Sequence, residues 1–312
     1  MMSKNCKIVM YHYVRPIKNS KYSHIKGLDL DGFINQLNYF KKNFTLITVQ
    51  QLLNATYQDV ELPERSILLT FDDGFKDHYL HVFPILEKLS VQGAFFPPAE
   101  PIERKKVLDV HKIQFILASC DNKHEIVSEI FSKVDYYRTE YGLDSPQQYF
   151  SKLATYDRFD TKEVVFIKRI LQRDLPRKIR SEIVNYLFEK FVHVDEASFA
   201  SDLYLSLDEM KEMIENGMYF GSHGYSHEWL SNLSSIELEL ELKKSLEFYL
   251  KINKKPTDLI MCYPYGDYND LVIKKIKELG FKAGLTTEVG DAELIQENAF
   301  RIRRYDTNDF PK

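Results

Sequence analysis

Two adjacent carboxylates, Asp72 and Asp73, follow the apolar run SILLTF at residues 66–71 and precede Gly74. An unbroken apolar run of this length is typical of a strand buried on both faces of a parallel sheet. Enzymes built on parallel barrels place catalytic residues where strands end, because the connecting loops gather there. One carboxylate could therefore bind a metal ion while the other acts as a base. Taken alone, Asp-Asp-Gly is equally ordinary turn chemistry.

Two histidines four residues apart, His223 and His227, follow a second predicted strand at residues 218–221. Side chains at this spacing lie on one face of a helix or converge from a tight loop, and imidazole nitrogen is a common ligand of zinc and similar ions. A lone pair of this kind is more often incidental. Together with Asp73 the pair completes three protein ligands, which leaves room for water and substrate as a catalytic site requires.

A third segment, Cys262 to Gly266, follows a predicted strand at residues 259–262. Its residues Tyr263, Pro264 and Tyr265 could wall a sugar-binding site, and a backbone N–H of the turn could stabilise an oxyanion. The alternative interpretation is a rigid turn without a function.

Strands and helices alternate on both sides of a long helical stretch. Strands are expected at residues 6–14, 46–49, 66–71, 93–96, 218–221, 259–262 and 281–285, and helices at 30–44, 78–89, 206–215, 234–250 and 271–279. This alternation indicates an α/β fold with a parallel sheet or barrel. Between residues 99 and 204 no buried strand is expected, and helical periodicity predicts a helical insertion. We expect it to cap the barrel mouth and restrict substrate size; a separate domain without a role in activity is the alternative.

The composition limits the possible partners and the location. The chain has 312 residues, with 42 basic and 46 acidic side chains, so its charge does not favour nucleic acid. Three scattered cysteines, Cys6, Cys120 and Cys262, fit a reduced compartment. There is no signal-peptide pattern and no apolar stretch of about 18 residues, so we expect a cytoplasmic protein without stable membrane insertion. The oligomeric state is left open.

The motifs TFDDG at 70–74, GSHGYSH at 221–227 and YPYG at 263–266 resemble, in order and spacing, those of the polysaccharide deacetylase family (carbohydrate esterase family 4, with the NodB-homology domain). The resemblance covers roughly residues 6–98 and 205–305. It implies a distorted (β/α) barrel with fewer than eight regular strands, formed by residues 1–98 and 205–312 and carrying a helical insertion at 99–204. It also implies one divalent metal ion, zinc first, with cobalt or nickel as alternatives.

The resemblance also assigns roles to individual residues. Asp73, His223 and His227 would be the metal ligands, and Asp72 the general base that takes a proton from the attacking water. Tyr265 would supply the N–H that holds the oxyanion. A general acid must then protonate the leaving amine.

Two departures from the family pattern affect this scheme. The family often has its acid as a late histidine, but no histidine follows His227. His12, in the first predicted strand, is the best substitute, because some members have a Tyr-His there. Cys262 stands where many members have an arginine that steadies the base. Three arginines of the expected final strand could approach instead: Arg301, Arg303 and Arg304.

The sequence therefore predicts a metal-dependent hydrolase that removes an N-acetyl or N-formyl group from a sugar in surface polysaccharide synthesis. The expected substrate is an acetamido sugar that is nucleotide-linked, lipid-linked or part of an oligosaccharide. Two alternatives stay open: a catalytically silent glycan-binding module that keeps the metal site, and a deacylase of a non-sugar amide.

Overall fold

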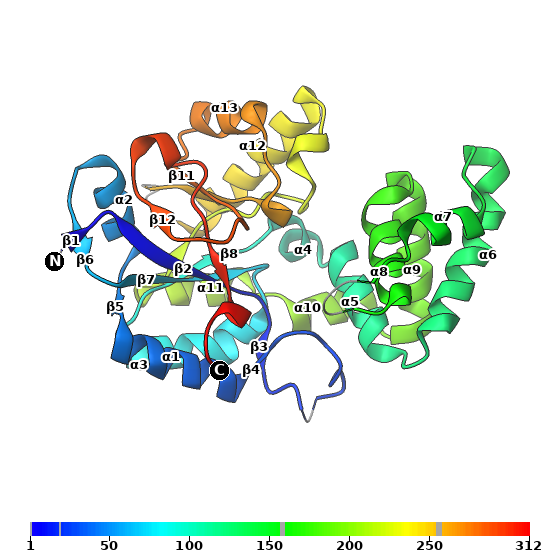
Figure 1. Ribbon diagram of the computed structural model, residues 1–312, viewed down its shortest axis with the longest axis horizontal. Helices are drawn as coiled ribbons and strands as arrows, with labels where there is room; N and C mark the ends of the chain where they lie inside the picture. Colours follow the sequence, from blue (N-terminus) through cyan, green and yellow to red (C-terminus); the bar gives the residue numbers. More distant parts are fainter. Residues whose placement is uncertain (1, 19, 157–159, 254–257) are drawn as a thin grey trace. The chain divides into compact units, whose positions relative to one another are not determined.

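The computed structural model divides into two compact units, shown in Figure 1, and describes every residue except 1, 19, 157–159 and 254–257. The first unit contains Met1–Pro16, Gly27–Lys106 and Ala200–Lys312, and the second contains Ile17–Lys26 and Val107–Phe199. Within the described residues no helix is long and apolar enough to cross a membrane.

The strands are short apart from two. They are β1 Met2–Ser3, β2 Asn5–Tyr11, β3 Val14–Arg15, β4 Leu28–Asp29, β5 Thr45–Leu46, β6 Leu62–Pro63, β7 Ser66–Asp72, β8 Gly93–Phe96, β9 Tyr219–Phe220, β10 Ile260–Cys262, β11 Ala283–Leu285, β12 Ala292–Glu293 and β13 Tyr305–Asp306. The helices of the first unit are α1 Leu30–Asn43, α2 Val49–Tyr57, α3 Phe83–Lys88, α4 Ala99–Arg104, α11 Leu207–Glu215, α12 Ser235–Ile252 and α13 Asp270–Glu278.

The parallel strands close into a ring. β2, β7, β8 and β9 pair in that order, and β10 pairs with β11. A bridge from Ser222 to Met261 joins the chain beyond β9 to β10, and a bridge from Leu285 to Ile302 joins β11 to the segment before β13. Since β13 pairs with β2, the pairings return to their starting strand. This is the distorted (β/α) barrel with fewer than eight regular strands that the sequence predicted.

The barrel interior is apolar, and alternation along the strands decides which side chains enter it. One core cluster joins residues from around the ring with residues of α2, among them Leu52 and Leu53; its ring members include Ile8, Leu68, Ala94, Phe96, Ile260, Cys262, Ala283, Leu285 and Ile302. Neighbouring residues such as Val9, Leu69 and Phe95 belong to another cluster, which includes residues of α1, α3 and α11. Asp72 lies two residues beyond Thr70 and four beyond Leu68, so it shares the inward face of β7.

Local capping explains where the sequence-based boundaries were right and where one was wrong. Ser234 begins α12 with a capping box, so the alternating segment after it is a helix, as predicted. The sequence predicted a strand at residues 46–49, but only Leu46, the last residue of β5, is in a strand. Thr48 instead caps α2 through a capping box with Gln51. The predicted helix at 78–89 begins with a π-helical turn at His78–Val82 before α3.

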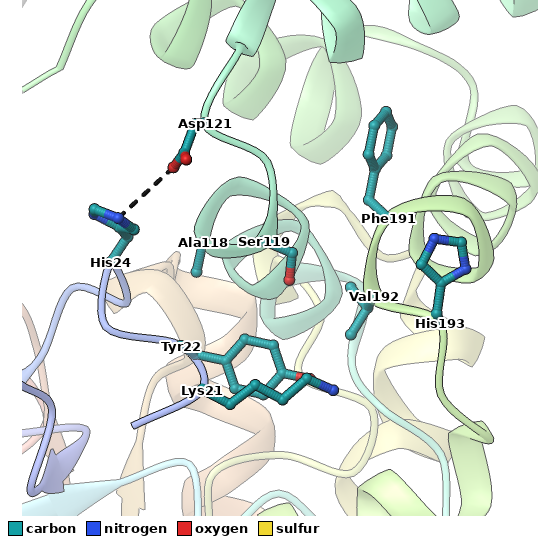
Figure 2. A pocket seen from close by; sticks show the side chains of 9 residues that line it. All are labelled: Lys21, Tyr22, His24, Ala118, Ser119, Asp121, Phe191, Val192 and His193. Atoms are coloured by element: carbon teal, nitrogen blue, oxygen red, sulfur yellow. Dashed lines mark ion pairs between the residues drawn. The ribbon is translucent and has the colours of Figure 1, made fainter. Parts of the chain in front are cut away.

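The second unit is helical, with α5 Asp109–Ser119, α6 Lys123–Tyr141, α7 Pro146–Leu153, α8 Lys162–Arg169 and α9 Arg177–Val192. α10, Glu196–Leu203, crosses the border between the units. The insertion boundaries at 99 and 204 stay a prediction. A pocket of about 440 Å³ within this unit includes the half-buried Tyr22 and an ion pair of 3.6 Å between His24 and Asp121, as Figure 2 shows. Both members of that pair are largely exposed, and none of the predicted site residues lines the pocket.

Gly221 lies at a close approach inside the barrel. A Cβ atom there would be 2.5 Å from Cε1 of Phe96 and 2.8 Å from the carbonyl oxygen of Ile260. We expect Gly221→Ala to lower the free energy of unfolding by about 1–3 kcal/mol, as overpacking does. Urea denaturation followed by the fluorescence of Trp229, the single tryptophan, measures this loss for the first unit.

Gly32→Ala is the matched control. A Cβ atom there meets the flexible end of Leu28, and alanine favours α1 by about 1 kcal/mol over glycine. We expect the control to be no less stable than the natural chain. Equal unfolding curves for Gly221→Ala and the natural chain would contradict the close approach.

Candidate metal-dependent active site

Asp72 is held at the end of β7 by a buried bidentate ion pair with Arg304. The guanidinium donates hydrogen bonds of 2.9 Å and 2.8 Å to the two carboxylate oxygens, and both side chains are at most 2% exposed. Arg304 also donates to the backbone carbonyl of Thr286 and to the hydroxyl of Thr70. Among the three arginines that the sequence offered, Arg304 is thus the one that reaches Asp72. Arg301 pairs with Asp270 and Arg303 with Glu288, both away from this carboxylate.

This ion pair keeps Asp72 charged. Burial alone would raise the pKa of its carboxyl, but the charge and hydrogen bonds of Arg304, together with the charges of His223 and His12, outweigh burial, so the pKa lies below its usual value. The pKa of Arg304 is raised in turn: burial alone would lower it, but Asp72 and Cys262 together more than compensate. Asp72 is therefore ionised at neutral pH.

The three predicted metal ligands converge. An oxygen of Asp73 lies 3.5 Å from Nε2 of His223 and 3.5 Å from Nε2 of His227, and all three side chains are buried. The possible ligand atoms of the three residues lie within 4.8 Å of one another. Two ligands about 2.1 Å from a tetrahedral zinc ion are separated by roughly 3.4 Å, so the spacing fits one ion.

The orientation of His223 also fits a metal ligand. Its Nδ1 lies 2.7 Å from the carbonyl oxygen of Cys262, which can only accept a hydrogen bond, so Nδ1 carries the proton. Nε2 is therefore the ring nitrogen that is available to bind a metal ion. Burial alone would lower the pKa of His223, but Cys262, Asp73 and Asp72 together raise it well above its usual value. The site thus attracts positive charge, which an ion would supply.

Left-handed backbone conformations aim several of these side chains. Asp73 has φ 71°, His227 has φ 57° and Tyr265 has φ 57°. Residues other than glycine rarely adopt such values, and each costs of order 1 kcal/mol. The conformations occur in the segments after β7, β9 and β10, where strand ends meet loops.

The Tyr-Pro-Tyr segment divides between core and site. The ring of Tyr263 is fully buried, stacks on Tyr268 and donates its hydroxyl proton to the carbonyl of Phe300, so it packs in the core rather than forming a wall for substrate. Pro264 is also buried. The ring of Tyr265 meets the His227 ring edge-on at 4.6 Å and stacks on Trp229 at 4.4 Å. Trp229, a residue that sequence reasoning did not single out, therefore joins the site.

His12 lies directly after β2 and close enough to Asp72 to influence the pKa of that carboxyl. Its backbone carbonyl accepts a hydrogen bond of 2.7 Å from Nε2 of His78, a fully buried histidine. Burial lowers the pKa of His78, so its imidazole is neutral and donates from Nε2 alone. Sequence reasoning missed His78; the only signal was a histidine among the aromatic residues Phe71 and Phe75.

A second group of possible ligands, Asp72, His223 and Cys262, is less suited to an ion. Arg304 already neutralises Asp72, and Nδ1 of His223 is occupied by the Cys262 carbonyl. Burial raises the pKa of the Cys262 thiol, so it remains protonated at neutral pH. The group of Asp73, His223 and His227 fits better.

A barrel that gathers a carboxylate and two imidazoles at its strand ends offers a ligand set that could hold a metal ion, at the rim where barrel enzymes place their catalytic residues. The family model described as polysaccharide deacetylase matches residues 59–136 and 176–284. The chain belongs to the polysaccharide deacetylase family. The match extends into helices of the second unit, beyond the range of the resemblance read from the motifs.

Individual relatives agree with this assignment. A Bacillus subtilis protein that carries the name polysaccharide deacetylase, YxkH, is 32% identical over 93% of this chain and 67% of its own length. The poly-beta-1,6-N-acetyl-D-glucosamine N-deacetylase of Escherichia coli is 22% identical over 84% of this chain, which spans only 31% of that relative. The Streptococcus pyogenes deacetylase PplD, solved with acetate, shares the fold with a TM-score of 0.60 at 18% identity, over 97% of this chain and 92% of its own.

Replacing Arg304 with methionine should leave the Asp72 charge buried and unpaired. We expect a loss of about 3–5 kcal/mol in the free energy of unfolding at pH 7. In the natural chain the pKa of Asp72 is lower in the folded state, so the stability from this pair is complete above pH 3.8 and is lost as the pH falls through the folded pKa. In Arg304→Met the unpaired Asp72 should have a raised pKa instead. The difference in the free energy of unfolding between the natural chain and the variant should therefore narrow as the pH falls from 7 to below 3.8.

Urea denaturation of the metal-free proteins over this pH range checks the prediction. Arg301→Met is the control, because Arg301 is half exposed and its partner Asp270 is almost fully exposed, and we expect no measurable loss. A difference for Arg304→Met that is independent of pH would show that lost packing, and not the charge, is responsible.

Proposed function

We propose that this chain is a metal-dependent N-deacetylase that hydrolyses the N-acetyl group of an acetamido sugar. The convergence of Asp73, His223 and His227 beside an ionised Asp72 is the observation that carries this proposal. Family membership and the substrate in the name of the Escherichia coli relative support the sugar amide as the target.

In this proposal, Asp73, His223 and His227 hold one divalent ion, zinc first, with cobalt or nickel as alternatives. When bound, such an ion supplies a Lewis acid and lowers the pKa of a coordinated water. Asp72 accepts the proton of the attacking water. Arg304 takes one position on each of its oxygens, and a carboxylate has about four acceptor positions, so Asp72 can still receive that proton.

The other residues predicted from the sequence stabilise the oxyanion and protonate the leaving amine. The backbone N–H of Tyr265 stabilises the negative charge that develops on the acyl oxygen. His12 protonates the leaving amine, a role that its proximity to Asp72 favours. The hydrogen bond from His78 to the His12 carbonyl fixes the backbone from which this imidazole projects.

Asp72→Asn and Asp73→Asn separate catalysis from metal binding. We expect Asp72→Asn to retain zinc while its rate of acetate release falls by about 10²–10⁴-fold, because the base is lost. Asp73→Asn should weaken zinc binding itself. Acetate release from acetamido sugars is measured with zinc or cobalt, using short β-1,6-linked N-acetylglucosamine oligomers and nucleotide-linked or lipid-linked sugars.

A natural chain that binds zinc but releases no acetate from any of these substrates would favour the silent glycan-binding module. Release from a simple amide but from no sugar would favour a deacylase of non-sugar substrates. The substrate panel also tests the form of the sugar. The cytoplasmic location, and a role of the helices between residues 99 and 204 in restricting substrate size, stay predictions.

His12→Gln tests the general acid. We expect kcat to fall by about 10²–10⁴-fold with unchanged zinc affinity, and the alkaline limb of the pH–rate profile to disappear, since that limb reports the acid. His124→Gln, on the exposed surface of α6, is the control and should leave the profile unchanged. An unaltered alkaline limb in His12→Gln would assign the proton donor elsewhere.

A further inference from the structure

Glu241 is a buried carboxylate of α12 that the scheme above does not use. It is 7% exposed and lies among the buried residues Leu238, Leu242 and Ser245 of that helix. A carboxylate in such a position is costly unless its oxygens accept hydrogen bonds. Its sequence signal was a glutamate on the apolar stripe of a helix, where a leucine would be ordinary.

Within the described part of the chain, the hydrogen bonds that Glu241 accepts all come from the ligand loop, defined as residues 223–227. One carboxylate oxygen accepts from the backbone N–H groups of Tyr225 and Ser226, each at 2.7 Å. The other accepts from the Ser226 hydroxyl at 2.7 Å. Bonds to a charged acceptor are about twice as strong as neutral ones, so one side chain organises the loop that joins His223 to His227.

The ligand loop is also held from its other side. Its carbonyls at Gly224 and Tyr225 accept hydrogen bonds from the first backbone N–H groups of α4, those of Ala99 and Glu100. Gly224 has φ 75°, and a Cβ atom there would lie 3.1 Å from the Glu241 carboxylate. The glycine therefore provides both the conformation and the space that this contact requires.

The same helix reaches the residue before the ligand loop. The hydroxyl of Ser245, one turn after Glu241, is hydrogen-bonded to the hydroxyl of Ser222. Residues four apart share one face of a helix, so a single face of α12 holds the chain at Ser222 and again at Ser226. His223 lies between these two attachments and His227 lies directly after them.

We propose that Glu241 is a positioning residue that fixes the separation of the His223 and His227 imidazoles for a divalent ion. It binds no ion itself and acts through the backbone of the ligand loop. The inference rests on the metal site of the proposed function. A loop with left-handed residues at Gly224 and His227 has other conformations available once the carboxylate is lost, and ion binding must then supply the cost of ordering it.

Zinc affinity of Glu241→Gln tests this proposal. Glutamine keeps the shape but has no charge and one acceptor oxygen instead of two. The two backbone N–H groups then bond to a neutral acceptor, and the Ser226 hydroxyl loses its carboxylate acceptor and can only accept from the amide nitrogen. We expect the dissociation constant for zinc to rise about 10–100-fold, the usual effect of removing a group that orients ligands. Competition with a chromophoric chelator measures the affinity, and the visible spectrum of the cobalt-loaded protein reports the ligand geometry, which we expect to change.

Glu239→Gln is the matched control. It lies two residues away on α12, and its carboxylate pairs with Lys243 and Lys275 at the surface, so zinc affinity should not change. Ser226→Ala removes only the hydroxyl bond to Glu241 and should cause a smaller loss in the same direction. Combined with Glu241→Gln it should add little, because both substitutions remove the bond that the Ser226 hydroxyl donates to the carboxylate.

The outcomes distinguish the two proposals. If the natural chain does not bind zinc at all, the metal site of the proposed function is overturned. Normal zinc binding by the natural chain together with equal affinity and an unchanged cobalt spectrum in Glu241→Gln would overturn the positioning role alone. If Glu241→Gln does not fold, Ser226→Ala decides: a several-fold weaker affinity supports the role, and an unchanged one contradicts it.

Discussion

The closure of the parallel ring is the constraint on which the site depends. Two of its joints are single bridges, from Ser222 to Met261 and from Leu285 to Ile302, so little regular pairing holds the late strands in place. Arg304 reinforces the second joint by bonding to Thr286 on one side and to Asp72 on the other. Because every strand of the ring points the same way, closing it brings all strand ends to one rim, and the candidate catalytic side chains arrive there together.

Two adjacent carboxylates obtain different roles from their surroundings. Asp72 faces the barrel interior, where a guanidinium matches its charge and keeps it ionised. Asp73, turned by its left-handed backbone, faces two imidazoles. One carboxylate is thus neutralised by the protein, and the other contributes a negative charge to a ligand set suited to a dication. Separation of neighbouring acids by environment is a general means of assigning them different chemistry.

The sequence predicted the strand ends, and the meeting of Asp73, His223 and His227 beside them, because both depend on local patterns. Asp-Asp-Gly follows a buried apolar run, and the two histidines follow another strand. Both motifs therefore lie at the rim regardless of how the rest of the chain folds. Arg304 was not separable from Arg301 and Arg303, since the choice depends on the register of an irregular segment that pairs by a single bridge before β13. Similarly, Tyr263 and Tyr265 look alike in sequence, but the backbone turns between them, and one ring enters the core while the other meets His227.

Glu241 and His78 lay outside sequence reasoning for a related reason. Each acts on a backbone group of a distant segment, and a contact of this kind leaves no spacing pattern in the chain.

The ion pair between Asp72 and Arg304 has a consequence for biosynthesis. Its partners are 232 residues apart in the chain. At a translation rate of about 5–20 residues per second, roughly 12–46 seconds pass between the synthesis of the carboxylate and that of its guanidinium. During that interval the nascent first half cannot bury Asp72 at low cost. The ribosome therefore completes most of the polypeptide before the barrel can close around Asp72.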